Sequence, residues 1–312
     1  MSGRRGSRLR GLVTVVLSLV VVALGGALLA LALRGPSDQA SAGPAPKGFA
    51  DYSWDELAEV ADMVAAAPSD EEAHAVAARY DVAPGASRRA RLDDGTVVDV
   101  VVAGLRHDEL ADGSGVAGLT LLLSPVATRP MNASATSEGG WESSGLRAWL
   151  ASDGMALLPD DLAAVVRPAL KSSNDQGTTR GFEGIAQTAD ALWAPSVAEV
   201  CGDVAWFQDE YGSEPNAYTN YVDFRPYDRL LSSEGSQYEL FSAAGVDGAS
   251  SGASALVRLL RGADVAWWYR TPFPYVFDGG DDGYFYQVSP TGFPAAVGSA
   301  EQPAGVVVGL CL

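Results

Sequence analysis

The hydrophobic pattern of the chain begins with one long uncharged run, from residue 12 to residue 33. Four arginines precede this run and Arg34 follows it. As a helix that rises 1.5 Å per residue, the run is about 33 Å long, which matches the roughly 30 Å hydrocarbon core of a bilayer. We therefore predict a transmembrane signal-anchor helix over residues 12–33, preceded by a basic tail over residues 1–11.

The arginine distribution predicts how the anchor is oriented. Basic residues remain on the cytoplasmic side of a membrane, so the N-terminus is expected in the cytoplasm and the rest of the chain outside the cell. A cleaved signal peptide is the alternative, but its apolar region usually has only about 7–15 residues and ends at a small-residue site. Ala30-Leu31-Ala32 lies inside the run and Ala40-Ser41-Ala42 lies beyond its end, which favours an uncleaved, single-pass anchor.

Two further segments separate the anchor from the rest of the chain. Residues 34–52 are rich in Gly, Pro, Ala and Ser and predict a flexible linker. Residues 53–84 place apolar side chains three and four positions apart, with capping-box patterns at Ser53-x-x-Glu56 and Ser69-x-x-Glu72. They predict a helical hairpin that either packs on the following domain or acts as a spacer.

Residues 87–312 lose the helical period and show short apolar segments separated by Gly and Pro, a pattern typical of short strands. Helix-start signals stand at Ser144, Pro159 and Ser196, and the polar stretch 172–189 predicts a long loop. This irregular order predicts an extracellular α+β domain of short helices packed on small, mostly antiparallel sheets. The predicted strands cover residues 96–105, 119–123, 192–194, 263–270, 284–288 and 305–312, after an alternating segment that begins at Ser87.

Charge and composition exclude several classes of partner. The 312 residues include 21 basic and 39 acidic ones, and five of the basic residues precede Pro36, which leaves a net charge of −23 on the remainder. Such an acidic chain repels phosphate backbones, so nucleic acid is not expected as a partner. Two histidines and two cysteines are too few for a zinc ribbon or a multi-histidine site, and no phosphate-binding loop occurs. We therefore expect no metal and no cofactor.

An ordered series of motifs gives the domain a family resemblance. The series is Trp141-Glu142-x-Ser144-x-Leu146-Arg147-x-Trp149-Leu150, Leu192-Trp193 with Ser196-x-x-Glu199, Trp267-Trp268-x-Arg270-Thr271-Pro272, and a closing Gly-Val-x-x-Gly strand. It resembles the bacterial cell-surface family classed as domain of unknown function 6273, from roughly Asp51 to Leu312. The resemblance implies export and a surface role, and it brings no established catalytic residue.

The last of these motifs also suggests a particular fold. A W-W-x-R-T-P sequence followed by a hydrophobic terminal strand is similar to the C-type-lectin-like and formylglycine-generating-enzyme fold. The family more often ends in V-R-P-A-L, and Val308-Gly309-Leu310-Cys311 replaces that ending here. If the family arginine serves a ligand, that role is missing from this chain.

This motif and the predicted strand 284–288 supply the candidate ligand-binding residues, which are Trp267, Trp268, Arg270, Tyr284 and Tyr286. Successive side chains on a strand face opposite ways, so one indole can fill the core while the other reaches the surface. The surface indole, with Tyr284 or Tyr286, would stack on a sugar or a peptide. The alternative is that both indoles are core residues and that Arg270 bridges loop carbonyls.

Cys201 and Cys311 are the only cysteines. In an exported domain they are expected to form a disulfide, and the alternative is a pair of buried free thiols. Three weaker patterns fit structural roles better than chemical ones. Asp278–Gly283 lacks the spacing of a calcium-binding loop, and Glu214-Pro215-Asn216 lacks the second motif of sugar-binding lectins. Asp99 and His107 would form a triad with a serine only if the fold brought them together.

We therefore expect a membrane-anchored extracellular protein that serves as a non-catalytic binding or adhesion module for a carbohydrate or a protein. Its second partner is the lipid bilayer around residues 12–33. The alternatives are an exported enzyme that acts on the cell envelope and a structural envelope component. An enzyme would need converging acids or a nucleophile–base pair in one cleft, whereas an aromatic face would favour a binding module.

Overall fold

The computed structural model describes residues 43–175, 184–249, 252–274 and 283–312. The predicted anchor over residues 12–33 lies outside these ranges. Within them, no helix is both long enough and apolar enough to cross a bilayer. The chain from Pro44 to Leu312 forms one compact unit that contains both hydrophobic core clusters described below.

The last part of the predicted linker belongs to this unit. The short helix η1 (Phe49–Asp51) and the residues around it pack on the domain, where Phe49 and Tyr52 are only 2% exposed. Lys47 also forms an ion pair with Glu56, at 2.7 Å between Nζ and Oε2. The prediction of a flexible linker is therefore wrong for residues 44–52. Although this segment is rich in Gly and Pro, its two aromatic side chains are buried against the domain and hold it in place.

The helical hairpin is confirmed as α2 (Trp54–Ala65) and α3 (Asp70–Arg79). The Ser53 hydroxyl accepts a hydrogen bond from the Glu56 amide and the Glu56 carboxylate accepts one from the Ser53 amide, so the first capping box is complete. The apolar face of α2 is buried in the same core cluster as strands of the domain. The hairpin therefore packs on the domain and does not act as a spacer.

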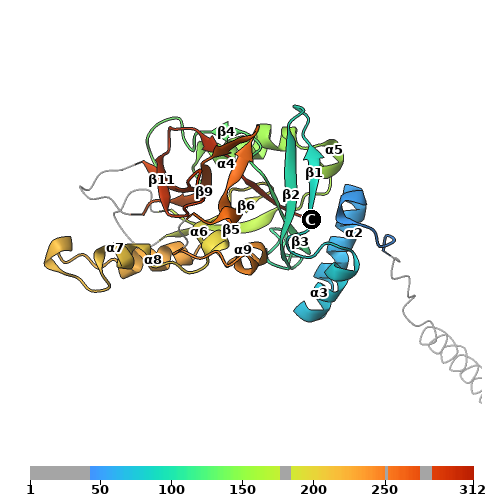
Figure 1. Cartoon of the computed structure of the whole chain (residues 1–312), viewed down its shortest axis with the longest axis horizontal. Coiled ribbons are helices and arrows are strands. Elements are labelled where there is room, and N and C mark those ends of the chain that lie inside the picture. The colour runs from blue at the N-terminus through green and yellow to red at the C-terminus, as the bar shows by residue number, and fades with distance from the viewer. Residues whose placement is uncertain (1–42, 176–183, 250–251, 275–282) are drawn as a thin grey trace, which may run out of the picture. The chain divides into compact units, whose positions relative to one another are not determined.

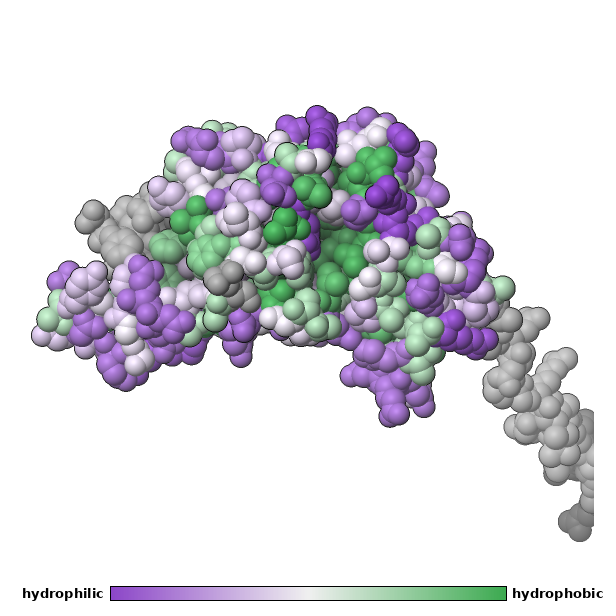
Figure 2. Space-filling view, viewed as in Figure 1, coloured by the Kyte–Doolittle hydropathy of each residue, from purple (hydrophilic) through white to green (hydrophobic). Residues whose placement is uncertain are grey.

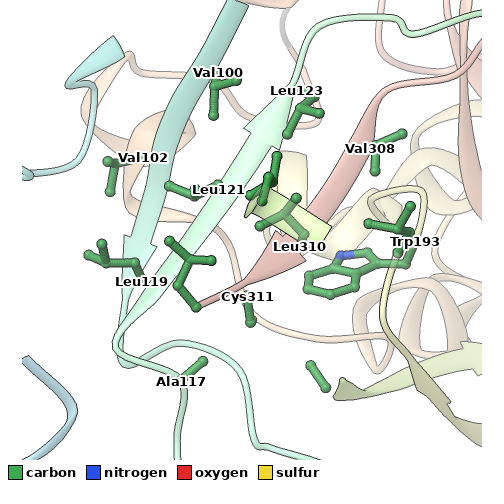
Figure 3. Close-up of a cluster of buried hydrophobic side chains, with 14 of the residues drawn as sticks. Val100, Val102, Ala117, Leu119, Leu121, Leu123, Trp193, Val308, Leu310 and Cys311 are labelled. Atoms are coloured by element: carbon green, nitrogen blue, oxygen red, sulfur yellow. The ribbon is translucent and has the colours of Figure 1, made fainter. Parts of the chain in front are cut away.

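The first sheet is built from β1 (Ser87–Arg91), β2 (Val97–Leu105), β3 (Leu119–Leu123) and β13 (Val308–Cys311). The strands stand in the order β1-β2-β3-β13, and every pair is antiparallel. All five residues of β3 are buried, which agrees with a sequence that is apolar except for Thr120. Figure 3 shows Leu119, Leu121 and Leu123 of this strand among Val100, Leu310 and the Trp193 indole, side chains that come from distant parts of the sequence.

The second sheet has five strands in the order β11-β10-β9-β12-β4. The β12–β9 pair is parallel and the other pairs are antiparallel. The C-terminal segment connects the two sheets, because β12 belongs to the second sheet and β13 belongs to the first. The strands are β4 (Thr128–Arg129), β9 (Trp267–Pro272), β10 (Tyr284–Val288), β11 (Ala296–Ser299) and β12 (Ala304–Gly305).

Two small hairpins complete the strands. The first pairs β5 (Ala169–Asn174) with β6 (Ile185–Asp190), and the second pairs β7 (Arg258–Leu260) with β8 (Ala263–Val265). The prediction of a long loop is therefore wrong for residues 172–174 and 185–189, which belong to strands, while residues 176–183 lie outside the described ranges. The buried positions of β5 include Lys171, Ser173 and Asn174, so the apolar alternation that marks most strands is missing there. The predicted strand 192–194 is reduced to a single bridge between Trp193 and Gly309.

Short helices cover the sheets. Ser144, Pro159 and Ser196 precede helices as predicted. The helices α7 (Trp206–Tyr211), α8 (Arg225–Ser232) and α9 (Glu239–Ala243) were not predicted; they lie in a row along the lower side of the domain in Figure 1, and α9 packs against β2 of the first sheet. The architecture is thus α+β, with short helices on small, mostly antiparallel sheets. The remaining helices are α4 (Gly145–Trp149), η2 (Leu150–Gly154), η3 (Met155–Leu157), α5 (Asp160–Ala163), α6 (Val197–Cys201), η4 (Ala217–Thr219) and η5 (Ser254–Leu256).

The close packing of α2 against the segment before β3 depends on Gly118. A Cβ atom at this position would overlap the backbone carbonyl of Ala61 in α2. We predict that Gly118→Ala lowers the free energy of unfolding of the Pro44–Leu312 unit by about 1–3 kcal/mol, because a backbone group must move to admit the methyl group. Urea unfolding measures this loss.

Gly145→Ala is the matched control, since a Cβ there would lie 3.4 Å from the nearest atom, the Met131 carbonyl oxygen. Its stability should change little. An equal effect of the two substitutions would contradict the close approach of α2.

Candidate functional site

Strand β9 carries three of the predicted ligand-binding residues, and all six of its side chains are buried. Trp267 and Trp268 face opposite ways as predicted, but each belongs to a core cluster: Trp267 to the second and Trp268 to the first. The prediction that one indole reaches the surface is therefore wrong, because both faces of β9 are covered. Their ring nitrogens donate hydrogen bonds to the carbonyls of Leu256 and Arg129.

Arg270 has the role that the alternative interpretation gave it. Its guanidinium donates to the backbone carbonyls of Ser172, Ala194 and Glu234 at 2.9–3.1 Å. It also binds the Glu199 carboxylate through two nitrogens, at 2.5 and 3.0 Å. Since Arg270 is fully buried, the fork-like pairing with Glu199 balances its charge inside the protein.

A second buried cation extends this pair into a network. Lys171 lies between Glu199 and Asp108, and its Nζ is 2.5 Å from Asp108 Oδ1. The Thr120 hydroxyl donates to the other oxygen of Asp108 at 2.7 Å. The four charged side chains are at most 4% exposed and form the chain Asp108–Lys171–Glu199–Arg270, which we call the buried ionic network. Its two positive and two negative charges cancel.

The network sets the ionisation of its own carboxylates. Burial alone would raise the pKa of Glu199, but the neighbouring charges of Arg270 and Lys171 lower it to about 2. In the same way, burial acts against the charged form of Asp108, and Lys171 nevertheless holds the pKa of Asp108 well below its ordinary value. Both side chains are therefore ionised at neutral pH.

Glu234 lies beside the network and behaves differently. Burial raises the pKa of its side chain to about 7, although Arg270 and several hydrogen-bond donors oppose this shift. The backbone and side-chain nitrogens of Asn174 both donate to Oε1 at 2.7 Å, and the Thr271 hydroxyl donates to Oε2. Glu234 is thus a buried carboxyl group that ionises near neutral pH.

The network joins two of the sequence motifs. Glu199 is the last residue of Ser196-x-x-Glu199, and Arg270 and Thr271 belong to the W-W-x-R-T-P motif. The Thr271 hydroxyl also accepts a hydrogen bond from the Val197 amide, at 3.0 Å. The motifs were visible in the sequence, but their pairing was not. Lys171 and Glu234 gave no signal, because neither residue belongs to a recognised motif; Lys171 directly precedes the segment predicted as a loop.

A small surface depression of about 170 Å³ opens above this network, with His107, Ser236 and Glu234 in its wall. His107 Nε2 lies 3.0 Å from Ser236 Oγ, and Nδ1 lies 3.3 Å from Asp108 Oδ1. These distances resemble a Ser–His–Asp triad. However, Nδ1 makes no hydrogen bond with a described residue, and Nε2 is equally close to the Ser236 carbonyl oxygen. The fold thus brings His107 to a serine, but not to the predicted Asp99, which faces Arg89 instead.

A larger cavity of about 590 Å³ lies beside the second sheet and is lined mainly by aromatic rings. The Tyr286 ring packs against Trp206 and Phe273, with ring centroids 5.1 and 5.4 Å apart. Asp209 and Glu210 of α7 also line this cavity, and both side chains are exposed. We call it the aromatic cavity; its rings are Trp206, Phe207, Tyr211, Phe273, Tyr286 and Phe293. Of the predicted ligand-binding residues, only Tyr286 lines it, and Tyr284 is 40% exposed elsewhere on β10.

The predicted disulfide between Cys201 and Cys311 is wrong, because both residues are buried free thiols. Cys201 belongs to the second core cluster, 3.7 Å from the Tyr269 hydroxyl, and burial raises the pKa of its thiol to about 12. Cys311 belongs to the first cluster, 3.7 Å from the Thr120 hydroxyl. The compartment alone suggested pairing, but the two side chains lie in different cores.

The weaker patterns have structural roles where they can be followed. Asn216 caps η4 by accepting hydrogen bonds from the amides of Tyr218 and Thr219, and Glu214 pairs with Arg225 at 3.2 Å. Most of the Asp278–Gly283 segment lies outside the described residues. In the part of the chain that is described, no group of three or more His, Cys, Asp or Glu side chains could hold a metal ion.

We predict that Glu199→Gln destabilises the domain by about 3–5 kcal/mol, because it leaves one buried cation of the network without a counter-charge. Glu56→Gln is the matched control, since Glu56 occupies the same third position of a capping box but is 34% exposed and pairs with Lys47 at the surface, where an ion pair contributes little. Glutamine keeps the capping acceptor in both variants, so urea unfolding isolates the effect of the charge. Similar losses in the two variants would contradict the network.

Glu234 predicts a pH dependence of stability. Its side chain holds a proton up to about pH 7 in the folded state but loses it above about pH 4.5 in the unfolded chain. The contribution of Glu234 to stability is therefore complete below pH 4.5 and is lost as the pH rises towards 7. Relative to Glu234→Gln, the free energy of unfolding of the wild type should fall by on the order of 3 kcal/mol over this interval. Urea unfolding of both proteins at pH 4.5 and 7.5 measures the difference. A difference that stays constant, or that rises with pH, would contradict this ionisation.

Comparison with known proteins identifies the family and nothing closer. No curated protein matches the chain. No solved structure matches it either. The family model of the domain of unknown function 6273 matches residues 117–312, which is more than half of the chain and includes the whole buried ionic network except Asp108. The chain therefore belongs to the family defined by the domain of unknown function 6273.

Proposed function

We propose that this chain is a bacterial surface protein whose exported domain binds a ligand without catalysing a reaction. Residues 12–33 would hold it in the cell membrane, with the N-terminus in the cytoplasm and the α+β domain outside. The length of the uncharged run and the excess of arginine before it support this arrangement. The acidic character of the remaining chain argues against nucleic acid as the ligand.

The aromatic cavity carries the proposal. Its volume of about 590 Å³ lies in the range of small-molecule sites, about 300–1,000 Å³, and such sites are mostly apolar with a few polar groups. Its rings offer flat apolar surfaces, while Asp209 and Glu210 offer carboxylate oxygens that accept hydrogen bonds. A saccharide has both matching features, apolar ring faces and hydroxyl donors. We therefore propose a carbohydrate as the ligand.

We also propose that the fold is C-type-lectin-like. Two features support this assignment: the C-terminal strand β13 returns to pair with β3 near the start of the matched region, and β9 with the W-W-x-R-T-P motif occupies the centre of the second sheet. An experimental structure of Pro44–Leu312 would test the fold together with the position of the ligand.

Phe293→Ala tests the binding site, because Phe293 lines the aromatic cavity and is 43% exposed. We predict that the Pro44–Leu312 unit binds a restricted set of glycans on an array and that Phe293→Ala weakens this binding about tenfold, as expected for the loss of one stacking ring. Val97→Ala, which alters a hydrophobic residue on β2 that is 51% exposed, should bind like the wild type.

Other outcomes distinguish the remaining possibilities. Binding to isolated envelope proteins that is lost in Phe293→Ala would keep the binding module and replace the ligand class. If neither glycans nor envelope proteins bind, the proposal is wrong and a structural envelope component is the better description.

The second candidate is an exported hydrolase, and the contact between Ser236 and His107 favours it. A serine hydroxyl 3.0 Å from an imidazole is the geometry of a nucleophile with its general base. The third member of a triad must hold the imidazole in place, but the Asp108 carboxylate is engaged by Lys171 and Thr120. This engagement is the reason why the binding module is preferred.

A fluorophosphonate probe, which reacts with activated serines, decides between the two functions. We expect no covalent labelling of the wild type, because His107 lacks an orienting hydrogen bond. Labelling that disappears in Ser236→Ala and persists in Ser233→Ala would establish the hydrolase instead. Ser233 is the control because its hydroxyl donates a hydrogen bond to the Leu230 carbonyl.

A further inference from the structure

A second cavity, separate from the aromatic one, is a groove of about 360 Å³ between the first sheet and α9. In Figure 2 it is the hollow with hydrophobic walls in the middle of the viewed face. Its walls include Val101, Leu122, Leu240, Phe241 and Leu259, and the last of these is 56% exposed. The groove therefore presents a continuous apolar surface to solvent, and such surfaces usually mark a binding site.

One cation, Arg258, lies in the wall of this groove. Its guanidinium stacks on the rings of Phe241 and Trp267, with its central carbon 6.0 and 5.7 Å from their centroids. Nη1 donates to the carbonyls of Ala255 and Val257, at 2.7 and 3.0 Å. Nε and Nη2 make no hydrogen bond within the described part of the chain, so one edge of the guanidinium is left with two parallel donors.

The charge of Arg258 also lacks a counter-charge. The fully buried cations Lys171 and Arg270 both pair with carboxylates, whereas no carboxylate of the described residues pairs with Arg258. Burial lowers the pKa of Arg258, which reflects the loss of water around its charge. Asp99 also lines the groove, but its side chain is 72% exposed and faces Arg89. In a chain with 39 acidic residues, a half-buried arginine that pairs with no carboxylate in the described ranges indicates a position for an external anion.

We propose that this groove binds a single-chain amphiphile with a carboxylate head, a fatty-acid-like ligand. The alkyl chain lies along the apolar walls, where the burial of each methylene group favours binding. The two carboxylate oxygens accept hydrogen bonds from Nε and Nη2 of Arg258, a planar match that an ammonium group does not offer. This site is independent of the aromatic cavity and of the ligand proposed there.

Dodecanoate and dodecanol provide the test, because they share the alkyl chain and differ in the charge of the head. In calorimetric titrations at pH 8, below the micellar concentration, the Pro44–Leu312 unit should bind dodecanoate at least tenfold more tightly than dodecanol. Arg258→Gln should weaken dodecanoate binding at least tenfold and leave dodecanol binding unchanged. Arg229→Gln, which removes an exposed arginine of α8, is the matched control and should behave like the wild type.

Two further measurements keep the result interpretable. Leu259→Ser, at the rim of the groove, should weaken both ligands by the same factor. If Arg258→Gln does not fold, as judged by thermal unfolding, the wild type is titrated with dodecyltrimethylammonium, which should bind no better than dodecanol. Absence of dodecanoate binding, equal affinity for all three heads, or full affinity in a folded Arg258→Gln variant would each overturn the proposal.

Discussion

The pairing of Glu199 with Lys171 and Arg270 is the interaction on which the arrangement of this domain depends. It joins helix α6, hairpin β5–β6 and the central strand β9, three elements that are far apart in the sequence. Removing one member would leave a charge buried without a partner, which costs more free energy than most single contacts supply. The network therefore fixes where these elements meet, and the aromatic side chains of β9 and β10 in the second core cluster pack around them.

The same constraint explains why the tryptophan motif is not a binding surface. Arg270 can reach Glu199 and three backbone carbonyls only if β9 lies in the middle of the molecule. Trp267 and Trp268, on either side of that strand, are then covered by the two core clusters. A motif that combines large aromatic residues with an arginine is thus compatible with a structural centre as well as with a ligand site. In this domain it belongs to the structural centre.

The surface features lie around this centre. The aromatic cavity and the apolar groove are formed by segments outside β9, and they differ in charge. Exposed carboxylates line the first, whereas the second contains the Arg258 guanidinium, which pairs with no carboxylate of the described residues, and the exposed Asp99, which faces Arg89. These opposite environments favour ligands of different chemistry, one neutral and rich in hydroxyls, the other apolar with an anionic head. The depression with Ser236 and His107 is smaller, and its nearest carboxylate is engaged by Lys171. The location of this depression above the buried ionic network is therefore not by itself evidence of catalysis.

The sequence by itself determined the features that depend on near neighbours. The capping boxes at Ser53 and Ser196 placed two helix starts correctly, and the β-branched run before Leu105 placed a strand, because these signals act within a few residues. Only the tertiary structure decided that Glu199 meets Arg270, 71 positions away, that the two cysteines lie in different cores, and that a polar segment folds into the β5–β6 hairpin. The physical reason is that the packing of distant elements determines which groups lie within a few ångströms of a buried charge or thiol. The residues nearby in the sequence do not indicate which groups these are.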